Sequence, residues 1–133
     1  MQKISTLYRP FHLKKSYKDI NEEQILSSLY TYKNGTVEEV VSRLINEAVL
    51  QHMHLYIDST ITQVVALNEY LCSLFMNNLE TLMLNYFLYY LETMPMEEID
   101  EETITKLEQL AQSVEMTAPL EELTLKIDEL CKV

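Results

Sequence analysis

Apolar residues recur at helical spacing in the segment that follows Gly35. They form one stripe with a period of 3.6 residues up to about Ile57: Val37, Val40, Val41, Leu44, Ile45, Ala48 and Leu55. Thr36 and Glu39 form a T-x-x-E capping box, whose hydroxyl and carboxylate satisfy backbone N–H groups that a first helical turn leaves free. The pattern therefore predicts a helix from Val37 to about Ile57 that is capped at Thr36.

The segment from Thr60 to Met94 carries a second helical pattern. Its inward positions are Val64, Leu67, Leu71, Leu74, Leu79 and Leu82, and its polar stripe is Thr62, Glu69, Ser73, Asn77 and Glu80. Asp58 and Ser59 are candidate caps for its start. Asn77-Asn78 is a weak helix breaker, so the pattern allows either two helices or one bent helix.

Three shorter patterns complete the helical prediction. A helix of about ten residues begins near Asn21 and ends at Asn34-Gly35. The acidic run Glu97–Glu102 leads into a helix whose first turn favours carboxylates, and Pro119 suits the first turn of the last helix. The chain is therefore predicted to be all-α, with about six helices and no strand.

Composition supports one helical domain. The chain has 133 residues, of which 47% are hydrophobic, with a single glycine and three prolines, a balance that favours long helices over turns. Residues 1–20 hold five of the ten basic side chains and one acid. We expect a basic N-terminal arm, solvated and partly flexible, followed by one helical domain from residue 21 to residue 133.

The charge distribution narrows the range of partners. The formal net charge is -11, and no Lys or Arg occurs between Leu44 and Thr105. Because such a surface repels phosphates, nucleic-acid binding by the body of the protein is not expected. Polar residues interrupt every long apolar run, so a membrane span is not expected. The N-terminus lacks the apolar core of a signal peptide, so none is expected either. Two isolated cysteines, Cys72 and Cys131, fit reduced thiols in a cytoplasmic protein.

Candidate chemistry in the sequence is sparse. His52 and His54 are two residues apart, which places them on roughly opposite sides of a helix and disfavours a shared metal ion. No serine or cysteine carries a recognisable catalytic motif, so an enzyme is not expected. His52 falls on the apolar stripe, either as a core histidine bonded to a carbonyl or side chain, or as a contact for a polar ligand head group inside the bundle.

The run N-Y-F-L-Y-Y-L, Asn85–Leu91, is apolar on all sides of a helix. It is explained by a central helix packed all round, by the face of a homodimer, or by an apolar tunnel for a chain-like ligand. In a central helix the tyrosine hydroxyls must find partners or reach the periphery. The tunnel lining predicted from helical phase is Leu71, Phe75, Leu79, Met83, Tyr86 and Tyr90.

The segment G-T-V-E-E-V-V-S-R-L-I, the aromatic run and the overall size resemble one family, the N-terminal sensor domain of sporulation histidine kinases. The resemblance covers roughly Asn21 to Val133. It implies a globin-like helical bundle without haem, a fatty acid in an internal tunnel and a halide ion nearby. It also implies a stand-alone copy that inhibits sporulation by competing with a sensor histidine kinase for its signal. The absence of any histidine after His54 agrees with a fold that holds no haem.

A fatty acid carboxylate in the bundle needs a hydrogen-bond donor. The candidates in and before the capped helix are His52, Tyr56, Arg43 and Lys33, although Arg43 also suits a surface pair with Glu47. The preferred hypothesis is a signalling module that binds a fatty acyl ligand and catalyses nothing. The alternative is an interaction inhibitor, of the phage or antitoxin kind, in which the acidic run Glu97–Glu102 covers a basic site on its target.

Overall fold

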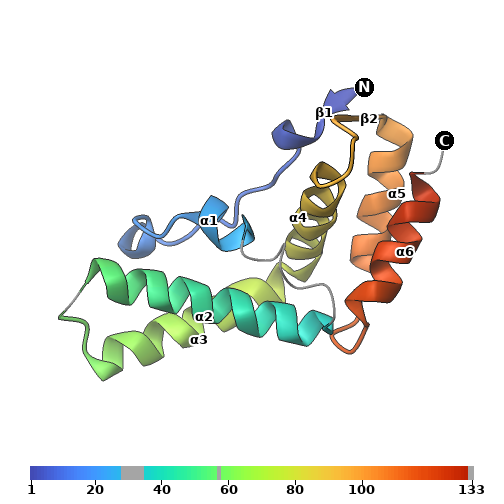
Figure 1. The fold of residues 1–133 in the computed structure, drawn as a ribbon. Coiled ribbons are helices and arrows are strands. Elements are labelled where there is room, and N and C mark those ends of the chain that lie inside the picture. Colours follow the sequence, from blue (N-terminus) through green and yellow to red (C-terminus); the bar gives the residue numbers. More distant parts are fainter. Residues whose placement is uncertain (28–34, 57, 132–133) are drawn as a thin grey trace.

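The computed structural model describes residues 1–27, 35–56 and 58–131, and the chain is 69% helical (Figure 1). The helices are α1 (Glu22–Ser27), α2 (Val37–Leu55), α3 (Ile61–Asn77), α4 (Leu79–Glu92), α5 (Glu101–Gln112) and α6 (Leu120–Leu130). Two 3-10 turns, η1 (Ile4–Thr6) and η2 (Lys15–Tyr17), lie in the N-terminal arm. The prediction of an all-α bundle with about six helices is confirmed. The predicted end of the first helix at Asn34 lies outside the described residues.

One detail of that prediction is wrong, because the described residues include a short strand pair. Strand β1 (Gln2–Lys3) pairs antiparallel with β2 (Glu98–Ile99), with Gln2 opposite Ile99. The backbone N–H of Ile4 extends the pairing by donating to the Glu97 carbonyl at 3.1 Å. Two-residue strands leave no alternating pattern in a sequence, and this pair depends on contact between segments almost a hundred residues apart.

Local capping chemistry sets where α2 and α3 begin. The Thr36 hydroxyl accepts from the backbone N–H of Glu39, as the T-x-x-E motif predicts. For α3 the predicted caps Asp58 and Ser59 are wrong. Thr60 is the N-cap and forms a complete capping box with Gln63, at 3.2 Å and 2.9 Å, because glutamine satisfies the cap N–H as well as glutamate does.

The long apolar segment is divided into two helices at Asn78. Its backbone lies outside the helical region, and its side-chain Nδ2 donates to the Leu74 carbonyl at 2.8 Å, which satisfies the end of α3. The Asn78 carbonyl in turn accepts from Leu82 in the first turn of α4. One asparagine therefore ends one helix and begins the next, so the direction of the chain changes there.

The antiparallel hairpin of α2 and α3 occupies one end of the molecule, and α5 and α6 run side by side at the other (Figure 1). Helix α4 lies between these two layers and carries the aromatic run. Its residues from Leu82 to Leu88 are all buried, and Phe87 is completely enclosed. The hydroxyls of Tyr89 and Tyr90 reach partners at the edge, the Glu23 carbonyl and the Asp128 carboxylate. The aromatic block is thus a central helix packed all round.

The N-terminal arm is packed across α4, where the sequence predicts a solvated tail. Ile4, Phe11 and Ile20 are buried in the same core as the helices. Asn85, a completely buried side chain on α4, accepts from the Arg9 N–H at 2.9 Å and donates to the Arg9 carbonyl at 2.7 Å. The Arg9 guanidinium also pairs with Glu108 of α5 at 2.8 Å. These contacts hold the arm against the bundle.

We predict that Asn85→Ala lowers the free energy of unfolding by about 2 kcal/mol, because both backbone groups of Arg9 lose their partners in a partly buried place. Asn68→Ala is the matched control, since Asn68 is exposed on α3 and its loss should change stability by less than about 0.5 kcal/mol. Urea denaturation followed by circular dichroism measures both. Equal stability of the two variants would contradict this role of Asn85.

Candidate functional site

A cavity of about 700 Å³ opens where the end of α2, the start of α3 and the turn η2 meet. Small-molecule sites usually have volumes of roughly 300–1,000 Å³, so the size suits a small ligand. The lining mixes aromatic, apolar and polar side chains: Ser16, Tyr17, His52, Leu55, Tyr56, Asp58, Ser59, Gln63 and Ala66. This group, named the His52 cavity below, contains two of the residues predicted from sequence, His52 and Tyr56.

His52 is the one buried polar side chain of this lining. Only 8% of its surface is exposed, and its Nδ1 atom is buried with no hydrogen-bond partner among the described residues. The predicted burial on the apolar face of the helix is confirmed. The hydrogen bond to a carbonyl or side chain, which the first interpretation required of a core histidine, is absent at Nδ1. Burying a nitrogen without a hydrogen-bond partner costs free energy. His52, which has such a nitrogen and lines the cavity, is therefore the candidate contact for a ligand.

Aromatic rings hold the imidazole in place. The Tyr17 ring meets His52 edge-on at a centroid distance of 5.7 Å, and the Tyr56 ring lies 4.7 Å away. Tyr17 in turn stacks on Tyr70 of α3 at 5.3 Å. Contacts at these distances are typical of aromatic pairs and restrict rotation of each ring. The imidazole is therefore fixed at the cavity wall by side chains from three segments of the chain.

The short connection between α2 and α3 forms the cavity floor. The Tyr56 N–H donates to the His52 carbonyl at 2.9 Å and ends α2, and the Ser59 hydroxyl donates to the Tyr56 carbonyl at 2.8 Å. The capping box then starts α3 at once. Because each step is a local hydrogen bond, the sequence directly places both helix ends at the cavity.

The N-terminal arm forms the opposite wall. The Lys14 N–H donates to the Tyr70 hydroxyl at 2.9 Å, and the Lys14 ammonium lies 4.4 Å from the centre of the Tyr70 ring. The Tyr56 hydroxyl donates a short hydrogen bond to the Asp19 carboxylate. This bond raises the pKa of Tyr56, because the carboxylate stabilises the protonated phenol. The Tyr56 hydroxyl is therefore engaged and is a poor donor for a ligand carboxylate.

Arg43, another predicted head-group residue, does not line this cavity. Arg43 is half-buried on α2, nine residues before His52, which corresponds to about 14 Å along a helix at 1.5 Å per residue. Lys33 lies outside the described residues. Among the predicted donors that the structure describes, His52 is the one that lines the cavity and has a buried polar atom without a hydrogen-bond partner.

The six predicted tunnel residues are part of the core. Leu71, Phe75 and Met83 are fully enclosed, Tyr86 is 5% exposed, and Leu79 and Tyr90 are half-buried. Phe75 packs edge-on against Phe11 of the arm at 5.1 Å. None of the six lines the cavities of about 940, 700, 420 and 300 Å³ that described residues form. A tunnel through this interior stays a prediction.

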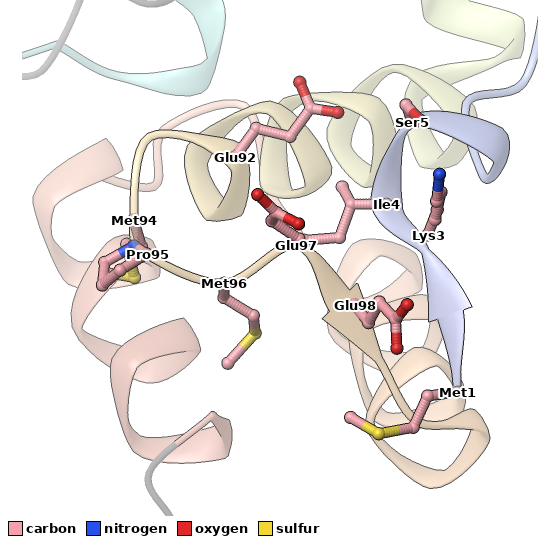
Figure 2. Close-up of a pocket in the computed structure, with 10 residues that line it drawn as sticks. All are labelled: Met1, Lys3, Ile4, Ser5, Glu92, Met94, Pro95, Met96, Glu97 and Glu98. Atoms are coloured by element: carbon pink, nitrogen blue, oxygen red, sulfur yellow. The ribbon is translucent and has the colours of Figure 1, made fainter.

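A larger cavity, of about 940 Å³, lies at the opposite end of the molecule. Figure 2 shows it framed by β1 and β2 on one side and by the Met94–Met96 segment on the other. Its charged side chains, Lys3, Glu92, Glu97 and Glu98, are all exposed. Since water solvates every charged group there, this cavity lacks the buried, unsatisfied atom that distinguishes the His52 cavity.

The acidic run before α5 has a structural use. The Asp100 carboxylate caps α5 by accepting from the Thr103 N–H at 2.8 Å. Hydrogen bonding from the Thr103 side chain, followed by that from this N–H, lowers the pKa of Asp100. Glu101 and Glu102 are exposed in the first turn, where the helix dipole favours carboxylates. A role of this run in covering a basic partner stays a prediction.

Comparisons with protein-family models, curated proteins and solved structures found no match. Among the described residues, no helix combines the length and apolar character that a bilayer crossing needs. The same residues contain no group of three or more His, Cys, Asp or Glu placed to hold a metal ion. Cys72 and Cys131 are free thiols.

We predict that His52→Leu leaves the free energy of unfolding unchanged or raises it by about 1 kcal/mol, because an apolar side chain removes the unsatisfied nitrogen. A histidine kept for stability would instead give a loss on replacement. His54→Leu, at an exposed position of the same helix, is the control for the added apolar surface. Urea denaturation near neutral pH measures both, and a loss above about 1.5 kcal/mol for His52→Leu would contradict the prediction.

Tyr90 gives a prediction at high pH. Burial, followed by the 2.9 Å hydrogen bond to Asp128, raises its pKa to about 12. The folded state therefore holds this proton more tightly than the unfolded chain does, where tyrosine ionises near pH 10. The stabilisation is complete below about pH 10 and is lost as pH rises through about 12. The stability difference between wild type and Tyr90→Phe should shrink over this range in urea denaturation, and a constant difference would contradict it.

Proposed function

We propose that this protein is a non-enzymatic signalling module that binds an amphipathic ligand, with the polar head group at Nδ1 of His52. The observation that supports this proposal best is the Nδ1 atom of His52, which is buried without a partner among the described residues, in a side chain that lines an open cavity. A bound oxygen atom would satisfy it. Ligand binding would then offset the free-energy cost of burying Nδ1 without a hydrogen bond.

The surroundings favour an anionic or strongly polar head group over a cation. A neutral imidazole with its proton on Nδ1 donates one hydrogen bond, and the Ser16 hydroxyl in the same lining offers a second donor. The first turn of α3 borders the cavity through Gln63, and a helix N-terminus attracts negative charge. Asp58 and Asp19, which accepts from Tyr56, oppose an anion, but both are exposed and water screens their charges.

The ligand tail has apolar surface to cover. Leu55, Ala66 and the faces of Tyr17 and Tyr56 line the cavity, and Leu67 lies completely buried one turn further along α3. Each buried methylene contributes about 0.8 kcal/mol, so a fatty acyl chain of ten or more carbons gains affinity without further polar contacts. In the predicted tunnel the chain continues toward Leu71 and Met83, whose flexible thioether adapts to a guest.

The proposed effect of ligand binding on signalling rests on the sequence resemblance. A stand-alone module that takes up a fatty acid withdraws it from a sensor histidine kinase with a similar domain, and sporulation signalling falls. In this scheme the protein needs no catalytic group.

We predict that the purified protein binds palmitate in a one-to-one complex, which native mass spectrometry detects, and that isothermal titration gives at least tenfold weaker binding for His52→Leu. The reason is that the variant keeps the apolar wall and loses the donor. His54→Leu should bind like wild type, because His54 is exposed and does not line the cavity. Absence of a palmitate complex, or equal affinity of wild type and His52→Leu, would contradict the proposal.

A further inference from the structure

Apolar side chains are exposed at the end of the molecule that holds the His52 cavity. The most exposed is Ile61, with 84% of its surface accessible at the first position of α3. The others on this hairpin end, named the hairpin tip below, are Met53, Leu55, Tyr56 and Val65, each exposed by between 40% and 49%. Leu55 and Tyr56 also line the cavity mouth, so the apolar tip and the cavity are continuous.

Three lysines of the arm lie beside this tip. Lys14, Lys15 and Lys18 are exposed within and next to η2, whose residues Ser16 and Tyr17 form one wall of the cavity. Figure 1 shows this part of the arm beside the end of the α2–α3 hairpin, away from α5 and α6. The described acids near it include Asp19, which accepts the Tyr56 hydroxyl, the exposed Asp58, and the exposed Glu69, one turn beyond the cavity-lining Ala66 on α3.

The rest of the molecule has the opposite charge. The chain carries a formal net charge of -11 and has no Lys or Arg between Leu44 and Thr105. Three lysines against these three acids make the tip less negative than the chain as a whole. A field of this kind orients the molecule near a negative surface, with the tip toward the surface and the body away from it.

We propose that the hairpin tip docks on the surface of an anionic lipid bilayer. Ile61, Leu55 and Met53 enter the interfacial region, Tyr56 lies at headgroup level, and the lysine ammonium groups meet lipid phosphates. Stable binding to an anionic bilayer needs both exposed apolar side chains and lysines, because neither the apolar contacts nor the charges alone suffice. The acidic body is repelled and faces water.

A second copy of this chain is a poorer fit for the same surface. In a two-fold dimer through the tip, the lysine triplets of both copies would come together, and like charges across an interface disfavour association. A lipid surface supplies the opposite charge. Docking also directs the cavity mouth at the bilayer, so an acyl ligand could enter without crossing water. The docking itself rests on the tip alone and does not depend on the ligand proposal.

The test is co-sedimentation of delipidated full-length protein with vesicles. One set contains phosphatidylcholine only, and the other contains phosphatidylcholine mixed with phosphatidylglycerol. We expect binding to the mixed vesicles, at least tenfold weaker binding to phosphatidylcholine alone, and weakening as salt is raised. Equal binding to the two vesicle types, or no binding to either at low salt, would overturn the proposal.

Matched variants separate the tip from the rest of the surface. Ile61→Asp should reduce vesicle binding at least tenfold, whereas Leu125→Asp should not, because Leu125 is also an exposed apolar residue, at 59%, but lies on α6. Lys15→Glu with Lys18→Glu should abolish binding, and Lys106→Glu with Lys126→Glu should leave it unchanged. Equal losses in tip and control variants would contradict docking through the tip.

Two further measurements exclude the other occupants and separate the two proposals. Light scattering should show that wild type and Ile61→Asp have the same mass, and a dimer that Ile61→Asp dissociates would overturn the lipid proposal in favour of self-association. His52→Leu should bind vesicles like wild type. Vesicle binding without palmitate binding would support the docking proposal and refute the ligand proposal. Palmitate binding without vesicle binding would support the ligand proposal and refute the docking proposal.

Discussion

The double hydrogen bond between Asn85 and the backbone of Arg9 is the constraint on which the rest of the structure depends. A primary amide presents one acceptor and one donor side by side, as a peptide group does, so a single side chain on the central helix can hold an extended segment by both of its polar groups. With Arg9 fixed, Phe11 can pack on Phe75 and Tyr17 can reach Tyr70. Asn85 on α4 therefore helps to position the arm that forms one wall of the His52 cavity, although α4 does not line the cavity.

The helices were predictable because their signals are local. The stripe after Thr36 and the acidic turn at Asp100 specify α2 and α5 within a few residues, and both begin where the cap chemistry requires. The start of α3 was missed by one or two positions, because Gln63 takes the place usually given to glutamate in a capping box. The two-residue strands had no local signal, since their pairing exists only when both ends of the chain meet.

The arm and the cavity show the limit of a periodicity argument. Ile4, Phe11 and Ile20 are buried, but their spacing fits neither helix nor strand, and each packs on side chains far away in sequence. The burial of His52 followed from its phase on α2, whereas the lack of a partner at Nδ1 follows from what Tyr17, Tyr56 and the arm leave around it. Tertiary contacts determine whether Nδ1 of His52 has a partner, and a single sequence does not show those contacts.

The arrangement in Figure 1 also bears on how the molecule can be connected to others. Met1 in the β1 region and the end of α6 lie together at the far side of the bundle from η2 and the α2–α3 connection. A fusion partner or a surface linkage attached at either terminus is thus separated from the cavity by the length of the bundle. A protein tethered before β1 or beyond α6 keeps the opening of the His52 cavity away from the tether, so the tether does not block the cavity.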